Sequence, residues 1–235
     1  MTRILPEIAA TALVIFSRFI TAARAIWLGC APENRRRVYF ANHTSNGDFV
    51  LVWAVLPHRL RQKTRPVAAS DYWLKSRLRA FIGQQVFRAV LINRIPEERT
   101  EDPVTQMAQA LDAGDSLILF PEGQRNTGED LLLPFKSGLY HLARMRPEVD
   151  LVPVWIENLN RVLPKGEVIP IPLICTVTFG AALHLTGGES KDAFLGRAAA
   201  ALRALAATGR VIWRSRCGST AQTRTKSPLL VWLAK

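Results

Sequence analysis

The sequence predicts a single α/β domain with a mixed, largely parallel sheet flanked by helices, preceded by an amphipathic amino-terminal helix. Three observations support this fold class: apolar strand-like runs alternate with helix-like segments from residue 37 onward, turn residues separate them, and 235 residues suit one hydrophobic core. We expect a membrane-interfacial helix within residues 1–30, the α/β domain over 31–213 and a loose basic tail over 214–235.

The amino-terminal helix is expected over residues 7–28, because Pro6 suits a first-turn position and Gly29 suits the position just past the end. The segment is long enough to cross a membrane, yet it contains Arg18 and Arg24. A central arginine costs about 2.5–3.5 kcal/mol on insertion scales. We therefore expect the helix to lie in the head-group layer with its arginines pointing outward. The alternative is a helix packed on the domain's own core.

The remaining elements follow from apolar runs and their boundaries. Asp102 is the expected N-cap of a helix that has Pro103 in its first turn and ends at Gly114, and Gly209 is expected to end the last helix. Strands are predicted over 37–41, 65–69, 89–93, 116–120, 151–156 and 173–180, and helices over 48–56, 71–80, 102–113, 137–146 and 190–208.

The positive charge is regional. The formal net charge is +12, but residues 58–94 alone hold nine Lys and Arg residues and one acidic residue. Such a region suits an anionic membrane, a phosphorylated substrate or nucleic acid. No zinc-finger spacing, RNA-binding aromatic signature or recognition-helix pattern accompanies it, which argues against nucleic acid.

The cysteines point away from metal and disulfide chemistry. The three of them lie far apart in the sequence, without a C-x-x-C pair, so we expect neither a zinc site nor a disulfide framework and infer a reducing compartment. No segment has the charged start, short apolar core and cleavage site of a signal peptide. These cysteines are Cys30, Cys175 and Cys217.

Two polar loops follow predicted strands, and in α/β sheets such loops form the ligand crevice. The first is "NHTSNGD", which places His43 in the loop and Asp48 in the first turn of the next helix. The carboxylate can fold back onto one imidazole nitrogen and leave the other free to accept a proton. No G-x-S-x-G elbow supplies a serine, so the nucleophile is expected to be a substrate hydroxyl. The alternative is a structural histidine.

The second loop, "PEGQR", supplies Glu122, Gly123 and Arg125. A carboxylate at a strand end can hold a sugar or glycerol hydroxyl, glycine allows close approach of a ligand, and an arginine fork can hold a phosphate. Arg94 is a further basic residue at a predicted strand end. The alternative is a surface turn with a solvated ion pair.

In combination, these motifs resemble the glycerolipid acyltransferase family. "NHTSNGD" is similar to its N-H-x-x-x-x-D motif, and "FPEGQR" with the downstream "PFKSG" is similar to its F-P-E-G-[T/S]-R motif. "FIGQQVFRAVLINR" and "LVPVWI" look like two further motifs, in family order. Within this family, the motifs most resemble those of the bacterial 1-acyl-glycerol-3-phosphate acyltransferases. Gln124 and Asn126 depart from the pattern, which leaves the identity of the acceptor more open than the reaction.

The resemblance implies a reaction without a covalent acyl-enzyme. His43 is the implied general base that takes the proton of the acceptor hydroxyl, and Asp48 orients it. Arg94 and Arg125 are the implied ligands of the acceptor phosphate.

The resemblance assigns two further groups. Glu122 and Gly123 position the glycerol part of the acceptor, and Val152, Pro153 and Val154 line or support the acyl-donor site.

The expected partners follow from this reaction. The donor is acyl-CoA or acyl carrier protein as co-substrate, the acceptor is a lysophospholipid, and no cofactor or metal is expected. The protein is expected at the cytoplasmic face of the inner membrane, on an anionic membrane surface, without nucleic acid. The alternatives are another acceptor, such as glycerol 3-phosphate or a lyso-aminolipid, and a non-catalytic protein that binds anionic lipid.

Overall fold

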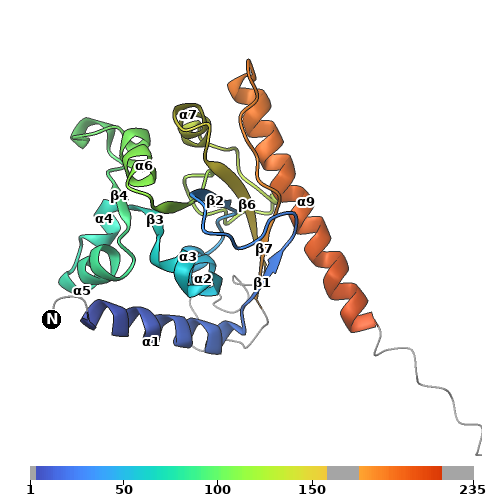
Figure 1. Cartoon of the computed structure of the whole chain (residues 1–235), viewed down its shortest axis with the longest axis horizontal. Helices are drawn as coiled ribbons and strands as arrows, with labels where there is room; N and C mark the ends of the chain where they lie inside the picture. The colour runs from blue at the N-terminus through green and yellow to red at the C-terminus, as the bar shows by residue number, and fades with distance from the viewer. Residues whose placement is uncertain (1–3, 158–174, 219–235) are drawn as a thin grey trace, which may run out of the picture.

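The fold is built on one sheet. The computed structural model describes residues 4–157 and 175–218, with the side chains of the last helix described up to residue 208. In this part of the chain a seven-stranded sheet has the order β1-β7-β6-β2-β5-β3-β4 (Figure 1). All neighbouring strands are parallel except β6 and β7, which confirms the predicted mixed, largely parallel sheet. The strands are β1 Arg24–Trp27, β2 Arg37–Ala41, β3 Thr64–Ala69, β4 Val90–Ile92, β5 Ser116–Leu119, β6 Asp150–Glu157 and β7 Thr176–Phe179.

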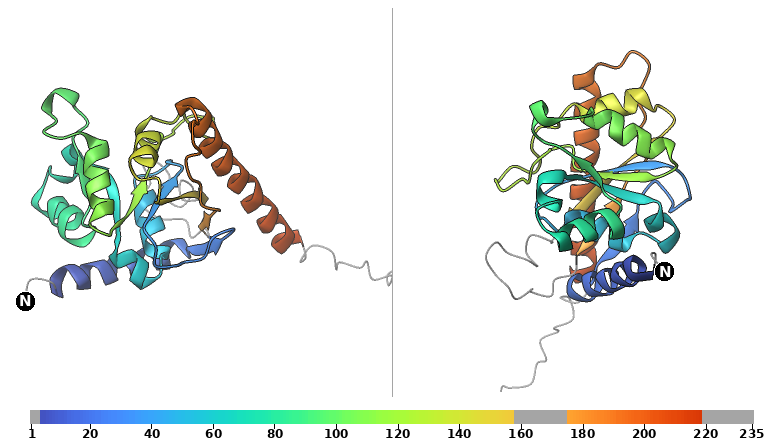
Figure 2. Two further views of the ribbon diagram at one scale, coloured as in Figure 1. Left: turned by 45° about the horizontal axis from the view of Figure 1, so that its top comes forward. Right: turned by 90° about the vertical axis from the view of Figure 1, so that its left-hand side faces the viewer.

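Helices cover both faces of this sheet (Figure 2). Side chains of α1 and α2 share one core cluster with one face of β2 and β6, and side chains of α6, α7 and α9 share a second cluster with the opposite face. Alternation of side chains along each strand produces this division. The helices are α1 Ile4–Thr21, α2 Asp48–Val55, α3 His58–Gln62, α4 Ser70–Trp73, α5 Arg77–Phe81, the π-helix η1 Ile82–Val86, the 3-10 helix η2 Pro96–Glu98, α6 Pro103–Asp112, α7 Gly138–Met145 and α9 Lys191–Gly218.

The prediction of one helix over 7–28 is wrong at its carboxyl end. The helix stops at Thr21, Ala22 takes a positive φ of 42°, and residues 24–27 form the edge strand β1 beside β7. The sheet therefore begins before residue 31. The apolar pattern continues without a glycine or proline through this junction, so periodicity alone does not mark the change from helix to strand.

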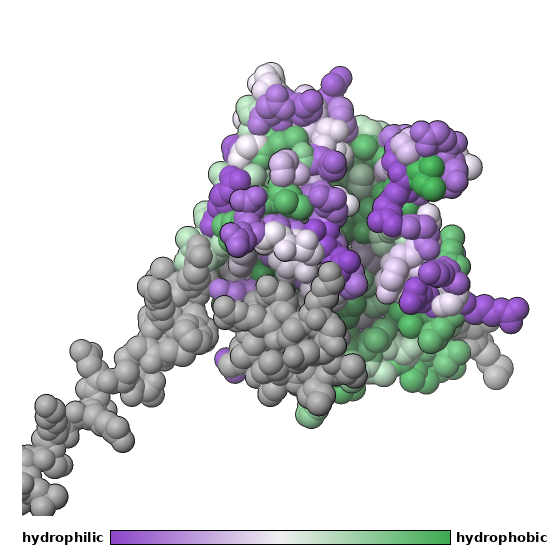
Figure 3. Space-filling model, turned by 180° about the vertical axis from the view of Figure 1, so that it is seen from behind, coloured by the Kyte–Doolittle hydropathy of each residue, from purple (hydrophilic) through white to green (hydrophobic). Residues whose placement is uncertain are grey.

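Helix α1 has two apolar faces. Its inner face, with Ala10, Leu13 and Val14, packs against the core, while its outer face exposes large apolar side chains, among them Phe19 at 87%. The helix is long and apolar enough to cross a membrane by length and composition, with 11% of the span buried. It lies along the lower side of the domain in Figure 1, and Figure 3 shows hydrophobic surface on that side from behind.

Two other predictions need correction. The helix expected over 71–80 is two short helices, because Ser76 caps α5 by accepting the N–H of Arg79. The last helix does not end at Gly209 but continues to Gly218, so the expected tail from 214 begins inside it, and residues 219–235 lie outside the described residues.

Helix α6 confirms its predicted boundaries. The Asp102 carboxylate accepts the backbone N–H groups of Val104 and Thr105 at 2.9 and 3.0 Å, Pro103 occupies the first turn, and Gly114 has a φ of +88° just past the end. An N-cap of this kind contributes about 1 kcal/mol.

Candidate active site

The candidate site lies between two neighbouring strands whose following helices cover opposite faces of the sheet. Strands β2 and β5 are adjacent and parallel, yet α2, which follows β2, covers one face, and α7, which follows β5, covers the other. Such a switch point opens a crevice at the carboxyl ends of the strands. The loops that leave β2 and β5 carry His43 and Glu122, so the structure brings the two predicted loops together.

Asn42 fixes the start of the first loop. Its side chain is buried, donates to the carbonyl oxygen of Ile156 at 3.1 Å and accepts the N–H of the same residue at 2.8 Å. These two bonds extend the hydrogen-bond pattern between β2 and β6 by one residue, with the Asn42 side chain in place of the backbone. The next residue, His43, therefore leaves the sheet from a fixed position.

The structure confirms the predicted contact between His43 and Asp48. The imidazole Nδ1 lies 2.9 Å from Asp48 Oδ2, and the same oxygen accepts the backbone N–H groups of Thr44 and Ser45 at 2.6 and 2.8 Å. Asp48 is fully buried in the first turn of α2, where the helix dipole stabilises a negative charge. Its Oδ1 has no hydrogen-bond partner among the described residues.

This contact determines which imidazole nitrogen can act as a base. A carboxylate only accepts hydrogen bonds, so neutral His43 carries its proton on Nδ1 and leaves the lone pair of Nε2 free. The ring stacks on Phe120 with 4.3 Å between centroids, and the side chain is 20% exposed. The imidazole is thus oriented on one side by a charge and on one face by an aromatic ring, and it stays accessible.

The position of Glu122 does not agree with the prediction that it holds an acceptor hydroxyl. The residue is 1% exposed, and both carboxylate oxygens accept backbone N–H groups at 2.8 Å, Oε1 from His43 and Oε2 from Leu133. Burial raises the pKa of this carboxyl, and the two N–H donors partly offset that effect. Glu122 therefore joins the β2 loop to the segment after β5.

Gly123 is required by the backbone conformation of the second loop. Its φ is +71°, a region that glycine adopts readily, and a Cβ at this position would lie 3.1 Å from Cγ of Lys136. Lys136, in the "PFKSG" stretch, is thus a basic residue beside the site that the residue-by-residue prediction missed.

Asn126 is a second residue that the prediction missed as part of the site. Its backbone N–H donates to the carbonyl oxygen of His43 at 2.7 Å, and its buried side chain bonds Asp130 and Gly128. His43 is therefore held at its N–H by Glu122 and at its carbonyl by Asn126. No short-range pattern in the sequence indicates these long-range bonds.

The two predicted phosphate ligands are both exposed. Arg94 follows β4 and forms a bidentate pair with Asp71, which follows β3, with Nε–Oδ1 and Nη2–Oδ2 distances of 3.2 and 2.5 Å. The Arg94 hydrogen bonds lower the pKa of the Asp71 carboxyl. Arg125 has no ion-pair partner among residues 4–157 and 175–208. Both arginines follow the carboxyl ends of parallel strands, as His43 does.

The "VPV" residues lie behind the site. Val152, Pro153 and Val154 are in β6, in register with Tyr39, Phe40 and Ala41 of β2. Val152 and Val154 are fully buried. They support the strand that carries His43 and do not line an open surface.

Side chains that could bind a metal are not grouped. Within the described residues, no set of three His, Cys, Asp or Glu side chains could hold a metal ion. Cys175 is buried, and burial together with the nearby charge of Asp48 raises the pKa of its thiol to about 11. This thiol is therefore not a thiolate nucleophile near neutral pH.

Comparison with solved structures gives a related fold. The structure matches the crystal structure of the 1-acyl-sn-glycerophosphate (LPA) acyltransferase PlsC from Thermotoga maritima with a TM-score of 0.61 and 16% identity, over 93% of this chain and 82% of that chain. At this identity the match concerns the fold.

Three sequence relatives are named 1-acyl-sn-glycerol-3-phosphate acyltransferase. The chain is 27% identical over 169 residues to 1-acyl-sn-glycerol-3-phosphate acyltransferase from Limnanthes alba (66% of this chain, 56% of the relative). It is 28% identical over 147 residues to that from Haemophilus influenzae (57% and 55%) and 33% identical over 142 residues to the alpha form from Homo sapiens (58% and 46%). The chain spans about half the length of these relatives.

A family model described as Acyltransferase matches residues 29–157. This range contains β2, β5, β6 and both polar loops of the candidate site. It also ends with the strand that carries "LVPVWI". The chain belongs to the acyltransferase family.

Proposed function

We propose that this protein transfers a fatty acyl group from an acyl thioester, acyl-CoA or acyl carrier protein, to the free hydroxyl of 1-acyl-glycerol-3-phosphate and so produces phosphatidic acid. The observation that carries the proposal is the contact of 2.9 Å between His43 Nδ1 and Asp48 Oδ2, which leaves Nε2 free. The names of the sequence relatives support this choice of acceptor and reaction.

The reaction needs one base and no protein nucleophile. His43 Nε2 takes the proton of the acceptor hydroxyl as its oxygen attacks the thioester carbonyl, which forms a tetrahedral oxyanion. The oxyanion collapses, the C–S bond breaks, and the leaving thiolate receives the proton from the imidazolium. Asp48 keeps the imidazole in the Nδ1–H tautomer and stabilises its positive charge.

Acid–base help of this kind contributes about 10²–10⁴ in rate, which corresponds to roughly 3–5 kcal/mol. The remaining acceleration comes from orientation of the two substrates and from stabilisation of the oxyanion. Fixed positions of the His43 N–H and carbonyl groups, held by Glu122 and Asn126, support the orientation part.

The acceptor phosphate is assigned to Arg94 and Arg125, which follow β4 and β5, the two strands that flank β3 in the sheet. Arg94 is already paired with Asp71, so a phosphate either displaces this carboxylate or binds to the N–H donors that the pair leaves unused. The exposed position of the pair supports exchange, since surface ion pairs contribute only about 0–1 kcal/mol.

The membrane location is assigned to the outer face of α1. Ile8, Ile15 and Phe16 are each 60% or more exposed on this face, and the opposite face packs on the domain. A helix that is apolar outward and attached to a domain inward suits the plane of the head-group layer. A basic region over residues 58–94 suits an anionic, cytoplasmic-facing leaflet.

Two alternatives follow from the same site. Another acceptor, glycerol 3-phosphate or a lyso-aminolipid, uses the same base, and only a phosphate-bearing acceptor depends on Arg94 and Arg125. A non-catalytic protein that binds anionic lipid needs neither member of the His43–Asp48 pair, so the buried, hydrogen-bonded Asp48 favours the enzyme.

The test is a thiol-release assay with the purified full chain, a set of lysolipids and glycerol 3-phosphate, and both donor types. We expect turnover with 1-acyl-glycerol-3-phosphate and its loss in His43→Ala. His141→Ala is the matched control, because it also removes a histidine, but one that lies on α7 and not in either loop of the candidate site. Near-normal turnover in His43→Ala contradicts the mechanism, and salt-dependent vesicle binding without turnover of any acceptor supports the non-catalytic alternative.

A further inference from the structure

Exposed apolar side chains are concentrated on two segments of the described chain. Of the twelve large apolar side chains exposed there, six lie on α1. Three more lie on the segment that contains α4 and α5, namely Tyr72 at 46%, Leu74 at 52% and Leu78 at 69% exposure. Exposed apolar side chains that cluster in this way mark a contact surface, whereas single ones are normal. The other three are Ile95, Leu131 and Met145.

The α4–α5 segment has an inner and an outer side. On the inner side, Trp73 meets Phe49 and Phe87 edge to face, with 5.8 and 6.1 Å between ring centroids. Gly83 lies so close to the Trp73 ring that a Cβ on it would be 2.9 Å away. The three exposed apolar side chains belong to neither core cluster. The inner side therefore fixes the segment on the domain and leaves the outer apolar side chains uncovered.

The outer side also carries positive charge. Lys75 and Arg77 stand between Leu74 and Leu78 in the sequence, and Arg79 follows. None of these three cations forms an ion pair with an acidic residue among residues 4–157 and 175–208. The acidic residue of α4 is Asp71, which is already paired with Arg94. The same surface thus combines exposed apolar side chains with three uncompensated positive charges.

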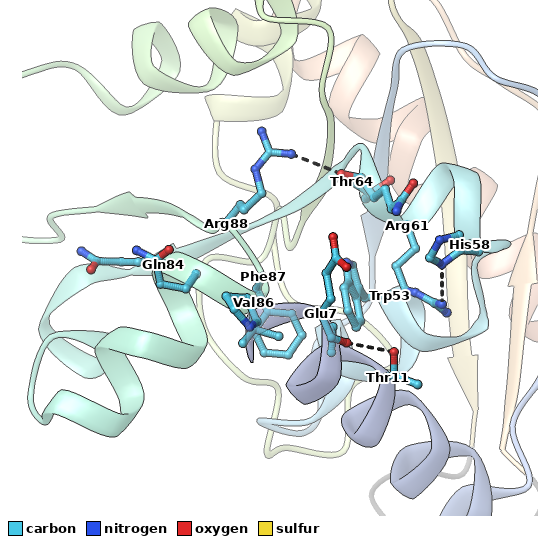
Figure 4. Close-up of a pocket in the computed structure, with 14 residues that line it drawn as sticks. Glu7, Thr11, Trp53, His58, Arg61, Thr64, Gln84, Val86, Phe87 and Arg88 are labelled. Atoms are coloured by element: carbon cyan, nitrogen blue, oxygen red, sulfur yellow. Dashed lines mark hydrogen bonds between the residues drawn. The ribbon is translucent and has the colours of Figure 1, made fainter. Parts of the chain in front are cut away.

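This segment lies beside α1, whose outer face the proposed function assigns to the membrane. Helix α5 runs directly into η1, and η1 contacts α1. Figures 1 and 2 show α5 next to the amino-terminal part of α1. A cavity of about 730 Å³ lies where they meet, with Glu7 and Thr11 of α1 on one side and Val86 and Phe87 on the other (Figure 4). The two groups of exposed apolar side chains are therefore neighbours in space.

We propose that the outer side of this segment enters the head-group layer of an anionic leaflet as a second membrane contact beside α1. The leucines lie among the upper acyl carbons, and the lysine and arginines bind lipid phosphates. This inference rests on the membrane location given in the proposed function and adds a second point of attachment to it. We name this surface, which consists of Tyr72, Leu74, Lys75, Arg77, Leu78 and Arg79, the α4–α5 surface.

A lipid leaflet matches this surface better than a protein partner does. Lysine is depleted in protein interfaces, and their buried centres are depleted in charge. Leucines separated by lysine and arginine are instead typical of segments that lie in the head-group layer, because long basic side chains extend from apolar surroundings to the phosphates. The Arg79 guanidinium lies 4.6 Å from the centre of the Tyr72 ring, and such amphipathic groups suit the same layer. The positive charges select an anionic leaflet.

A second contact fixes the orientation of the domain on the membrane. A domain attached by one helix can rock about the axis of that helix, and a contact away from this axis prevents the motion. Asp71, the partner of Arg94, is the second residue of α4. Immersion of the α4–α5 surface therefore places Arg94, the proposed ligand of the acceptor phosphate, at the level of the lipid head groups.

The first experiment measures binding of the purified full chain to vesicles by flotation, without an acyl donor. The vesicles contain equal amounts of dioleoyl-phosphatidylglycerol and dioleoyl-phosphatidylcholine, or phosphatidylcholine alone. We expect Leu74→Ser/Leu78→Ser to lower the partition coefficient for the anionic vesicles by about tenfold or more, because two apolar contacts are lost. The matched control is Leu131→Ser/Met145→Ser, which removes two exposed apolar side chains from other parts of the chain.

A second pair of variants tests the charge. We expect Lys75→Gln/Arg77→Gln to weaken binding to the anionic vesicles by about tenfold and to leave binding to phosphatidylcholine vesicles unchanged. The matched control is Arg144→Gln/Arg203→Gln, which removes the same charge from exposed positions on α7 and α9. Equal losses in the test and control variants overturn the proposal.

Two further outcomes also overturn it. One is vesicle binding that neither test variant weakens, which leaves α1 as the membrane contact. The other is unchanged vesicle binding together with a loss of turnover that appears only when acyl carrier protein is the donor, which identifies an acidic protein as the partner of this surface. If the proposed reaction is wrong, the unmodified chain turns over no acceptor, yet the vesicle comparison still decides whether the α4–α5 surface binds the membrane.

Discussion

Glu122 Oε1 accepts the backbone N–H of His43 at 2.8 Å, so the residue after β5 holds the residue after its neighbour β2. The second carboxylate oxygen holds Leu133 in the same way. A residue that looks like a substrate ligand in the sequence is thus a link between two loops. Its loss should move the imidazole rather than weaken acceptor binding alone.

The Glu122→Gln variant tests this link. An amide accepts one of the two backbone N–H groups and presents its own NH₂ to the other, so a buried hydrogen bond is lost, and we expect kcat to fall while the acceptor KM changes little. The measurement is steady-state acyl transfer. A large KM increase at unchanged kcat contradicts the linking role. Glu129→Gln, an exposed glutamate in the same segment, is the matched control.

The stability of the Glu122 site should depend on pH with a defined sign. Burial raises the pKa of Glu122, so the folded state binds the carboxyl proton more tightly than the unfolded state does. The resulting stabilisation is fully present below the unfolded pKa of about 4.3 and is lost as pH rises through the folded pKa. Urea unfolding at several pH values should therefore show that the stability advantage over Glu122→Gln shrinks as pH rises from about 4.3. An advantage that grows with pH contradicts the sign.

The Asp48→Asn variant tests the orienting carboxylate. Asparagine keeps the shape of the side chain and an oxygen that accepts the Thr44 and Ser45 N–H groups, but it removes the charge that holds His43 in the Nδ1–H tautomer. We expect kcat to fall by about 10²-fold or more. Asp102→Asn is the control, because asparagine is an equally good N-cap on α6. Comparable activity in the two variants argues against a role of Asp48 in the reaction.

The Asp71–Arg94 pair predicts a competition. Asp71→Asn removes the carboxylate that occupies the Arg94 fork, so the KM for a phosphate-bearing acceptor should fall, and Arg94→Ala should raise it by about tenfold. Neither change should alter stability by more than about 1 kcal/mol, because the pair is exposed. Asp112→Asn disrupts a similar exposed pair with Arg146 and serves as the control. A higher KM in Asp71→Asn shows instead that Asp71 positions Arg94.

Gly123→Ala tests the backbone of the second loop. An alanine at φ +71° costs about 1–2 kcal/mol and requires the Lys136 side chain to move. We expect lower activity and a lower unfolding midpoint in urea. Gly128→Ala is the control in the same loop, because a Cβ there meets only Asn126 Oδ1 at 3.7 Å. Unchanged activity in Gly123→Ala shows that the turn tolerates a side chain.

The central strands and α6 are predicted well because their signals are local. "RVYFA" and "SLILF" are short apolar runs with clear boundaries, and Asp102, Pro103 and Gly114 mark both ends of a helix. The edge strand β1 is not predicted, because four residues, "RAIW", follow an apolar helix without a break and gain their strand structure from pairing with β7. Where the local pattern is ambiguous, pairing with another strand determines the secondary structure.

The contacts of the candidate site also divide into those that the sequence predicts and those that it does not. The His43–Asp48 contact spans five residues and could be predicted from spacing, whereas the bonds of Glu122 to His43 and of Asn126 to His43 join residues about eighty positions apart. The pairing of Arg94 with Asp71 in α4 joins residues that follow different strands, so a linear pattern does not indicate it. Residue type predicted which groups gather at the sheet edge, but not which of them bind each other.

Helix α2 carries Asp48 at one end and contacts α1 along its side. With α1 immersed in a leaflet, this short connection sets a fixed height of the imidazole above the lipid surface. Under the proposed function, the protein would then meet its acceptor by two-dimensional diffusion, and its rate would follow the mole fraction of acceptor in the leaflet rather than the bulk concentration. Adding an inert lipid at constant total acceptor should slow turnover, and one vesicle encounter should serve many reaction cycles.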